Sequence, residues 1–256
     1  MTANNLRAIY AIWLRDVIRF KRDKYRIVSS LAQPVLFLFV FGNGLARGLS
    51  VDVGGAGQER GYVTFIYPGI IGMTLLFTSM FSAISIVWDR EFGFLKEVMV
   101  APISRSSVAI GKALGGSTVA LIQGACILLL APILGVELSP MLVAAVIPVM
   151  LLIAFSLTSM GIVIAAKMES MEGFQMIMNF LVMPLFVLSG AMFPLSRLPE
   201  WLRFLTRIDP LSYGVDALRG IMLGPSLAEF PLVLDLTLMT VFGAVMISVA
   251  VYLFER

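Results

Sequence analysis

Charge-free apolar runs alternate with short charged segments along this chain. A bilayer core about 30 Å thick requires roughly 20 residues of α-helix, because each residue adds about 1.5 Å. Five runs reach that length and a sixth falls just short of it. We therefore predict an all-α membrane protein with one domain, 1–256, whose six transmembrane helices lie at about 27–46, 62–87, 113–135, 140–166, 174–192 and 232–253.

The composition supports this interpretation. Hydrophobic residues make up 59% of the 256 residues and charged residues only 14%, with a mean hydropathy of +0.95. A soluble domain carries about a quarter charged residues, so most of this surface is expected to face lipid. The first apolar run follows a basic segment without a small-residue cleavage site, which favours a retained span over a signal peptide. Cys126, the only cysteine, lies within a predicted span and is expected to be a packing residue.

Lys and Arg gather in alternate connections, which predicts the orientation. They are frequent before the first run and after the second, and Lys167 and Arg256 lie on the same predicted side. The opposite side carries fewer, most of them between the fifth and sixth spans. By the positive-inside rule, both termini and the segment 88–105 should be cytoplasmic.

Residues 4–24 are predicted to form an amphipathic helix. Apolar positions recur every three or four residues, and Trp13 lies on that stripe, whereas Arg15 and Arg19 share another face. Such a helix should lie along the cytoplasmic leaflet, where its cations meet anionic head groups. The alternative is a basic flank that only orients the chain.

Two further patterns predict helix packing and short helices. Gly116, Ala120 and Gly124 recur every fourth residue in the third span, which favours close approach of another helix. Between the last two spans, Pro199 suits the first turn of one short helix. Asp209 with Pro210 is typical of the start of a second. We expect two outer helices within 197–224 that dip into or lie on the outer leaflet.

Several kinds of chemistry are missing from the sequence. It contains no histidine, which removes His-based catalysis and most zinc sites, and no GxxxxGK[ST] loop for binding nucleotide phosphates. The first five runs contain no ionisable residue, which disfavours ion-coupled transport. Polar residues inside the spans, Gln33, Gln123, Gln175 and Asn179, are expected mainly to form hydrogen bonds between helices.

The second and fifth spans are rich in Met and Phe, which could line an adaptable apolar cavity. Packing against lipid or other helices is the alternative explanation for such residues. The candidates for a substrate path are Met73, Phe77, Met80, Phe174, Met178, Leu185 and Phe186.

The segment "REFGFLKEVMVAPISR", Arg90 to Arg105, is a charged connection between two apolar spans. Its pattern predicts a helix to about Val100, a break at Pro102 and a new N-cap at Ser104. An apolar stripe with a charged rim suits docking into a groove of a soluble partner, although a solvated surface helix would show a similar pattern. The candidate coupling residues are Arg90, Glu91, Phe92, Gly93, Leu95, Glu97 and Met99.

"WDREFGFLKEVMVAPISRSSVAIGK", Trp88 to Lys112, strongly resembles the first cytoplasmic loop of ABC-2 type transporter permeases, the membrane subunits of bacterial ABC exporters. The resemblance extends to "RDVIRFKRDKYRIVSSLAQPVLFLFVFG" and "FPLSRLPEWLRFLTRIDPLSYGVDALRG". It implies a connecting helix at 4–24 and a coupling helix within 88–105, in which Glu91 and Gly93 match the acidic and glycine positions of the family.

The resemblance also implies partners and a mechanism. Two permease subunits, identical or different, would work with separate ATP-binding subunits, which bind Mg-ATP so that this chain needs no cofactor and is not itself an enzyme. The protein would lie in the bacterial cytoplasmic membrane, in contact with lipid and not with nucleic acid.

The expected substrate is a hydrophobic or amphiphilic drug or lipid, as in the drug-resistance and nodulation-factor branch. A polysaccharide or glycolipid exporter is the alternative within the family. Outside it, an ion-coupled carrier or channel, or a membrane enzyme or assembly scaffold, remains open on the residues alone.

Overall fold

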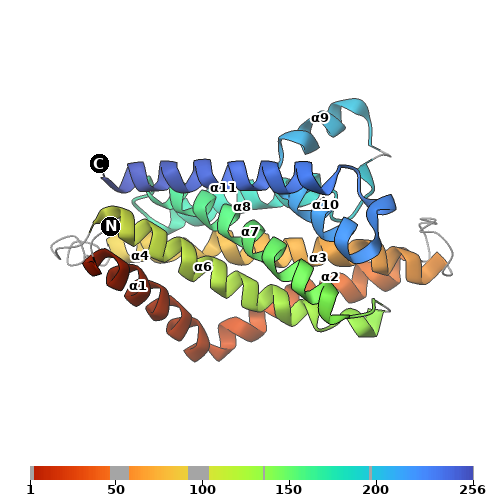
Figure 1. Cartoon of the computed structure of the whole chain (residues 1–256), viewed down its shortest axis with the longest axis horizontal. Coiled ribbons are helices and arrows are strands. Elements are labelled where there is room, and N and C mark those ends of the chain that lie inside the picture. The colour runs from red at the N-terminus through yellow and green to blue at the C-terminus, as the bar shows by residue number, and fades with distance from the viewer. Residues whose placement is uncertain (1–2, 47–57, 92–103, 135, 196–197, 256) are drawn as a thin grey trace.

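The computed structural model describes residues 3–46, 58–91, 104–134, 136–195 and 198–255. Within these ranges all regular elements are helical (Figure 1). They are α1 (Ala3–Arg22), α2 (Lys24–Ala46), α3 (Gln58–Ser82), α4 (Ile84–Glu91), α6 (Arg105–Leu128), η1 (Ala131–Leu134), α7 (Pro140–Ala165), α8 (Met171–Leu188), α9 (Glu200–Ile208), α10 (Pro210–Leu223), η3 (Pro225–Leu227) and α11 (Leu232–Glu255).

Five helical segments of the described chain are long and apolar enough to cross a membrane. They are Gly61–Glu91, Arg105–Leu128, Pro140–Ala165, Met171–Leu188 and Leu232–Glu255. The helix α2 contains a shorter apolar stretch, Ile27–Val40. The prediction of an all-α membrane protein is therefore confirmed, whereas a sixth span formed by α2 stays a prediction.

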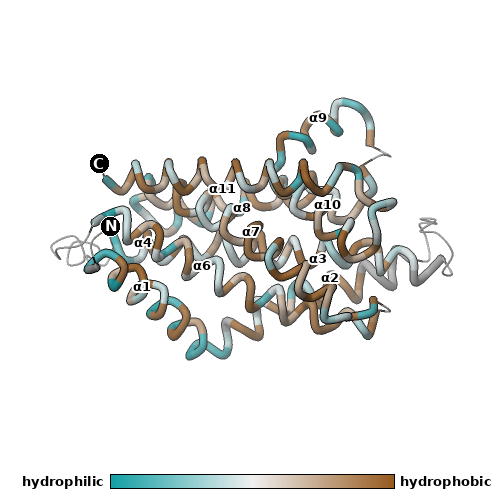
Figure 2. The backbone as a smooth tube through the Cα atoms, in the orientation of Figure 1, coloured by the Kyte–Doolittle hydropathy of each residue, from teal (hydrophilic) through white to brown (hydrophobic). Residues whose placement is uncertain are grey.

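The long helices run side by side, and α3 lies at the centre of the bundle, where it contacts α2, α6, α7 and α10. Figure 2 shows apolar residues along these helices and hydrophilic residues along α1 and α9. The beginning of α1 and the end of α11 lie at the same end of the bundle, and α9 projects near the other end (Figure 1). We call these the terminal end and the α9 end.

Small residues on α6 allow its neighbours to approach closely, as predicted. A Cβ atom on Gly116 would overlap side chains of Ser82 and Thr158, and one on Gly124 would overlap Met150 and Leu75. Ala120, between them, is fully buried. Dispersion between closely packed helices thus replaces the hydrophobic drive that lipid cannot supply.

The second predicted span is broken in two without a proline at the break. Helix α3 ends at Ser82 and α4 begins at Ile84, with Ala83 in a turn between them. A Cβ on Gly161 of α7 would crowd Ala83 and the Met80 backbone, so the break fits against a small residue. Helix breaks of this kind often mark hinges. The pattern of apolar residues did not predict it.

Both outer helices form where they were predicted, although Pro199 was expected in the first turn of α9. Pro199 precedes α9, and the Asp209 side chain caps α10 by accepting a hydrogen bond from the Leu211 N–H at 2.9 Å. Burial raises the pKa of Asp209 to about 7. Gly224, with φ of 106°, ends α10 in a conformation that favours glycine. Whether these helices enter the outer leaflet stays a prediction.

Candidate functional site

A charged network joins α1, α4 and α6 near the terminal end of the bundle. The Lys112 Nζ atom lies 3.0 Å from Asp89 Oδ2 and 3.6 Å from Asp16 Oδ1, and it donates a hydrogen bond to Ser85 Oγ at 2.9 Å. Arg15 contributes a second cation, 3.1 Å from the same Asp89 oxygen. We call these five residues the Lys112 network.

Burial makes the Lys112 network unusually sensitive to the loss of one member. The side chain of Lys112 is 4% exposed, and those of Asp16 and Asp89 are 14% and 13% exposed. Away from water, charges that lose their partners are costly. The network therefore fastens the N-terminal helix to the inner part of the bundle by specific charge pairing.

Two further contacts hold α1 in place. The indole Nε1 of Trp13 donates a hydrogen bond to Thr118 Oγ1 at 3.0 Å, and the Arg19 guanidinium lies over the Trp88 ring, 5.1 Å from its centroid. The predicted residues Trp13, Arg15 and Arg19 thus all contact α4 or α6. Their assignment to a connecting helix remains a prediction.

Arg90 lies at the end of α4 and donates hydrogen bonds to the Met168 carbonyl at 2.8 Å and the Ala166 carbonyl at 2.9 Å. These acceptors follow the end of α7, where unpaired carbonyls and the helix dipole favour a cation. Arg90 thus links α4 to the α7–α8 connection. Glu91 is exposed at the end of α4. The other coupling candidates, Phe92, Gly93, Leu95, Glu97 and Met99, lie outside the described residues.

Arg90→Met is expected to lower the free energy of unfolding by about 2 kcal/mol, because two charge-assisted hydrogen bonds disappear while the acceptors stay partly buried. Lys167→Met is a matched control, since it removes an exposed cation from the same region. Denaturant titration in mixed micelles measures both variants. Equal small effects would contradict the capping role of Arg90.

A cavity of about 450 Å³ lies among α2, α3, α6 and α8, and we call it the mid-bundle cavity. Among the residues that the structure describes, no ionisable side chain lines it. Its lining residues are Ser30, Gln33, Pro34, Met73, Thr74, Phe77, Thr78, Phe81, Gln123 and Asn179.

Gln123 organises one wall of this cavity. Its amide donates a hydrogen bond to Ser30 Oγ of α2 and accepts one from Thr78 Oγ1 of α3. The prediction that Gln123 connects helices is therefore confirmed. Pro34 has no N–H to offer the Ser30 carbonyl, which leaves a backbone acceptor beside the cavity. Gln33 and Asn179, in contrast, are exposed side chains at the cavity.

The structure separates the predicted substrate-path residues into two groups. Met73 and Phe77 line the mid-bundle cavity. The others lie in or against the apolar core, and Phe186 stands edge-on to Phe77 with ring centroids 6.5 Å apart. These core residues are Met80, Phe174, Met178, Leu185 and Phe186. Direct substrate contact stays a prediction for all seven.

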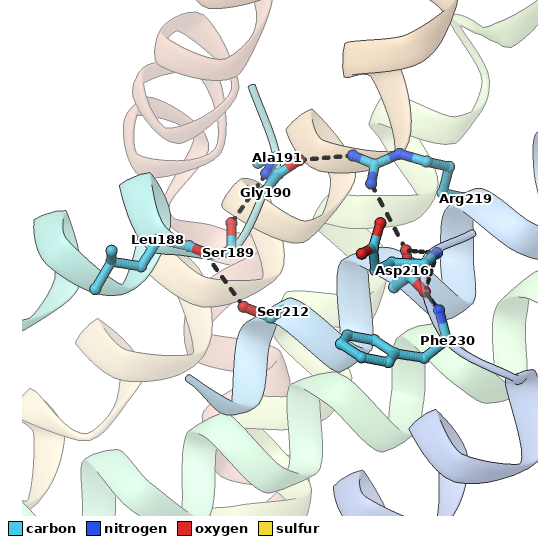
Figure 3. A network of polar contacts seen from close by, with 9 residues as sticks. Leu188, Ser189, Gly190, Ala191, Ser212, Asp216, Arg219 and Phe230 are labelled. Carbon is cyan, nitrogen blue, oxygen red and sulfur yellow. Dashed lines mark hydrogen bonds and ion pairs between the residues drawn. The ribbon is translucent and has the colours of Figure 1, made fainter. Parts of the chain in front are cut away.

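A second polar network lies toward the α9 end, between α10 and the segments on either side of it (Figure 3). The Asp216 carboxylate accepts hydrogen bonds from the N–H groups of Glu229 and Phe230 at 2.8–3.0 Å. Arg219 donates to the Gly190 carbonyl at 2.7 Å and lies 3.8 Å from Asp216. Its guanidinium also lies over Phe65, 4.1 Å from the ring centroid.

This arrangement ties the end of α8 to α10 and to the start of α11. Asp216 and Arg219 are both almost fully buried, and burial lowers the pKa of Arg219 to about 10 although Asp216 opposes that shift. Asp235, at the start of α11, is also buried, and neither of its carboxylate oxygens has a hydrogen-bond partner in the described residues. In the sequence, Asp235 is only a charged residue next to the start of the last apolar run.

The helices of membrane-spanning length, with a neutral cavity between them, are consistent with a multi-pass membrane protein. Residues 7–223 match the family described as ABC-2 type transporter, and the chain belongs to this family. Its members are transport permeases, which are not themselves catalytic. The resemblance found in the sequence is thereby confirmed.

Curated relatives support the same assignment. The putative transport permease ycf38 of Cyanophora paradoxa is 30% identical over 217 residues, which cover 84% of this chain and 73% of that protein. Nodulation protein J of Rhizobium leguminosarum bv. trifolii is 30% identical over 84% of this chain and 80% of its own length. Nodulation protein J of Rhizobium meliloti strain 1021 is 28% identical over 86% and 82%, respectively.

Sequence reasoning missed the Lys112 network as a unit. Asp16, Asp89 and Lys112 are far apart in the sequence. Asp89 and Lys112 look like ordinary flanks of apolar runs, and Asp16 looks like a polar position of the predicted amphipathic helix. The available signal was opposite charge on three predicted segments expected to lie near the same membrane surface. That signal predicts proximity but not which charges pair.

Proposed function

We propose that this chain is the permease subunit of an ATP-driven exporter that moves a hydrophobic or amphiphilic substrate out of the cytoplasm or the inner leaflet. Separate ATP-binding subunits hold Mg-ATP, and a second permease copy, identical or different, completes the pathway. The chain lies in the bacterial cytoplasmic membrane with six spans and both termini inside.

The mid-bundle cavity is the observation that carries this proposal. Its side chains offer amides, hydroxyls, thioether and aromatic groups but no charge. A charged group entering it would lose hydration without gaining a counter-ion, which is costly in a membrane interior. An uncharged amphiphile, whose polar part forms hydrogen bonds and whose remainder contacts Met73 and Phe77, suits this lining. A glycolipid head group fits the same chemistry, whereas the volume is small for a sugar polymer.

The exposed amides support a second permease copy. Gln33 lies in α2 and Asn179 in α8, and both residues are exposed in the single chain. An amide exposed to hydrocarbon is costly because lipid offers no hydrogen-bond partners. A central pathway shared by two copies would provide water, substrate or protein partners for both side chains.

In the proposed cycle, ATP binding brings the two ATP-binding subunits together, and their motion acts on the segment 88–105. The α4 helix is joined to α1 and α6 by the Lys112 network and to the α7–α8 connection by Arg90. Displacement of α4 would therefore move several helices together, while the break at Ala83 lets α3 respond differently. The cavity would then face alternately inward and outward.

Asn179→Leu is expected to reduce ATP-driven efflux of an uncharged fluorescent amphiphile by about two- to tenfold, because one hydrogen bond to the substrate is lost. Gln175→Leu is the matched control, since Gln175 is an exposed amide one turn away on α8 that does not line the cavity. Efflux is measured in vesicles containing the permease with its ATP-binding subunit.

Two outcomes would contradict the proposal. If Asn179→Leu and Gln175→Leu transport alike, the cavity is not the substrate path. If efflux survives ATP depletion and collapses with the proton gradient, the protein is an ion-coupled carrier.

A further inference from the structure

A second cavity, of about 280 Å³, lies beneath α1 and differs in character from the mid-bundle cavity. We call it the α1 cavity. Its walls come from α1, from the α3–α4 junction, and from α6 and α7. Four charged residues line it, namely Asp16, Arg19, Asp23 and Lys112. The two linings therefore suit different ligands. The mid-bundle cavity suits an uncharged ligand, and the α1 cavity suits a ligand that carries both a positive and a negative charge.

The α1 cavity lies at the height expected for lipid head groups. The junction between α1 and α2 carries Lys21, Arg22 and Lys24, all exposed. Three clustered cations cannot enter hydrocarbon, so this junction marks a membrane surface. Trp88, a residue type that favours membrane interfaces, forms part of the same cavity.

Arg19 supplies a phosphate-binding group. Its guanidinium is restrained over the Trp88 ring, and within the described residues its N–H groups form no hydrogen bond or ion pair. A planar guanidinium with free donors suits a phosphate, which it can bind through two oxygens. Lys112 is different, because Asp89, Asp16 and Ser85 already surround its ammonium group.

The two carboxylates determine which phosphate fits. Asp16 and Asp23 would repel a free dianionic phosphate. A cation carried by the same ligand can add to the pairs that Asp16 already forms with Lys112 and Arg15, because an ionised carboxylate accepts about four hydrogen bonds. Ethanolamine phospholipids combine a phosphate monoanion with an ammonium that donates hydrogen bonds to carboxylates. A choline group has no N–H and prefers aromatic faces, and here Arg19 covers the Trp88 face. A glycerol head group brings no positive charge.

We propose that the α1 cavity binds the head group of an ethanolamine phospholipid from the adjacent leaflet. The phosphate lies on Arg19, and the ammonium lies between Asp16 and Asp23. The cavity holds the head group while the acyl chains remain in the bilayer. The bound lipid fills the space between α1 and the α3–α4 break, so that it acts as a structural cofactor of the terminal end.

Native mass spectrometry of the full chain in detergent tests this site. The protein is titrated with dioleoyl lipids that carry ethanolamine, choline or glycerol head groups, and with inorganic phosphate as a competitor. We expect the ethanolamine lipid to bind at least about tenfold more tightly than the choline lipid. Arg19→Gln should weaken binding of the ethanolamine lipid by about tenfold.

Two variants separate the site from general charge effects. Arg22→Gln removes the same charge from the same helix but lies outside the α1 cavity, and it should leave binding unchanged. Asp23→Asn, at an exposed position, should reduce the ratio of the affinities for the ethanolamine and choline lipids. Both lipids should still bind through their phosphate groups.

Equal losses in Arg19→Gln and Arg22→Gln would overturn the proposal, as would a preference for the glycerol lipid. If inorganic phosphate displaces the ethanolamine lipid and binds as tightly as the lipid does, the site belongs to a free anion instead. If Arg19→Gln disturbs the fold of α1, the Asp23→Asn variant decides whether the site exists. An unchanged preference for ethanolamine over choline lipid in that variant would overturn the proposal. None of these measurements requires the ATP-binding subunit, so a failure here leaves the proposed function intact.

Discussion

Lys112→Met is expected to lower the free energy of unfolding by about 3 kcal/mol. The substitution keeps much of the side-chain volume but leaves Asp16 and Asp89 with only Arg15 to balance two partly buried carboxylates. The N-terminal helix should then detach from α6 more readily. Denaturant titration in mixed micelles, together with limited proteolysis of residues 3–22, measures both effects.

The combined variant Lys112→Met, Asp16→Asn and Asp89→Asn makes this test specific. Replacing the buried members of an ion cluster together leaves no unpaired buried charge, whereas removing one partner does. The remaining cation, Arg15, is 37% exposed and can be hydrated. The triple variant should therefore recover most of the stability lost by Lys112→Met. Lys21→Met, which removes an exposed cation from α1, is the control. A triple variant less stable than Lys112→Met would show that packing, and not charge balance, dominates.

Asp216→Asn is expected to be the most damaging conservative change at the α9 end, with a loss of about 2–4 kcal/mol. It removes the negative charge beside the buried Arg219 and one oxygen that accepts backbone N–H bonds. The segment after α10 should loosen, which hydrogen exchange at Glu229 and Phe230 can detect alongside denaturant titration.

Asp235→Asn provides the matched comparison. The residue is as deeply buried as Asp216, but its carboxylate oxygens have no hydrogen-bond partner within the described chain. An amide of the same shape avoids burying an unpaired charge, so stability should stay equal or increase. A large loss in Asp235→Asn would show that this carboxylate has a partner in the assembled transporter.

The sequence predicts helix positions well, because charge-free runs and capping residues are local signals. Ser104 caps α6 and Asp209 caps α10 as predicted, since the side chain that caps a helix is next to it in the sequence. The Gly116 interface also followed from spacing alone. These features depend on chemistry within a few residues.

The candidate sites were harder to predict from the sequence, because they depend on which helices become neighbours. Gln33 and Asn179 were interpreted mainly as hydrogen-bonding residues between helices, whereas both are exposed at a cavity. Arg90 was expected to face a soluble partner, and its donors reach the carbonyls at the end of α7. Such roles depend on the direction in which a side chain points from its helix. The number of charges in a segment does not reveal that direction.

The two cavities lie next to each other at the break at Ala83. Phe81, just before it, lines the mid-bundle cavity, whereas Ser82 and Ile84 line the α1 cavity. If the proposed substrate and the proposed head group each bind better to one of two arrangements of this break, their affinities are thermodynamically linked. If a bound head group changes the affinity for the substrate by some factor, the substrate changes the affinity for the head group by the same factor. The phospholipid composition of the membrane would then set the working affinity of the transporter, with no change in the cavity that holds the substrate.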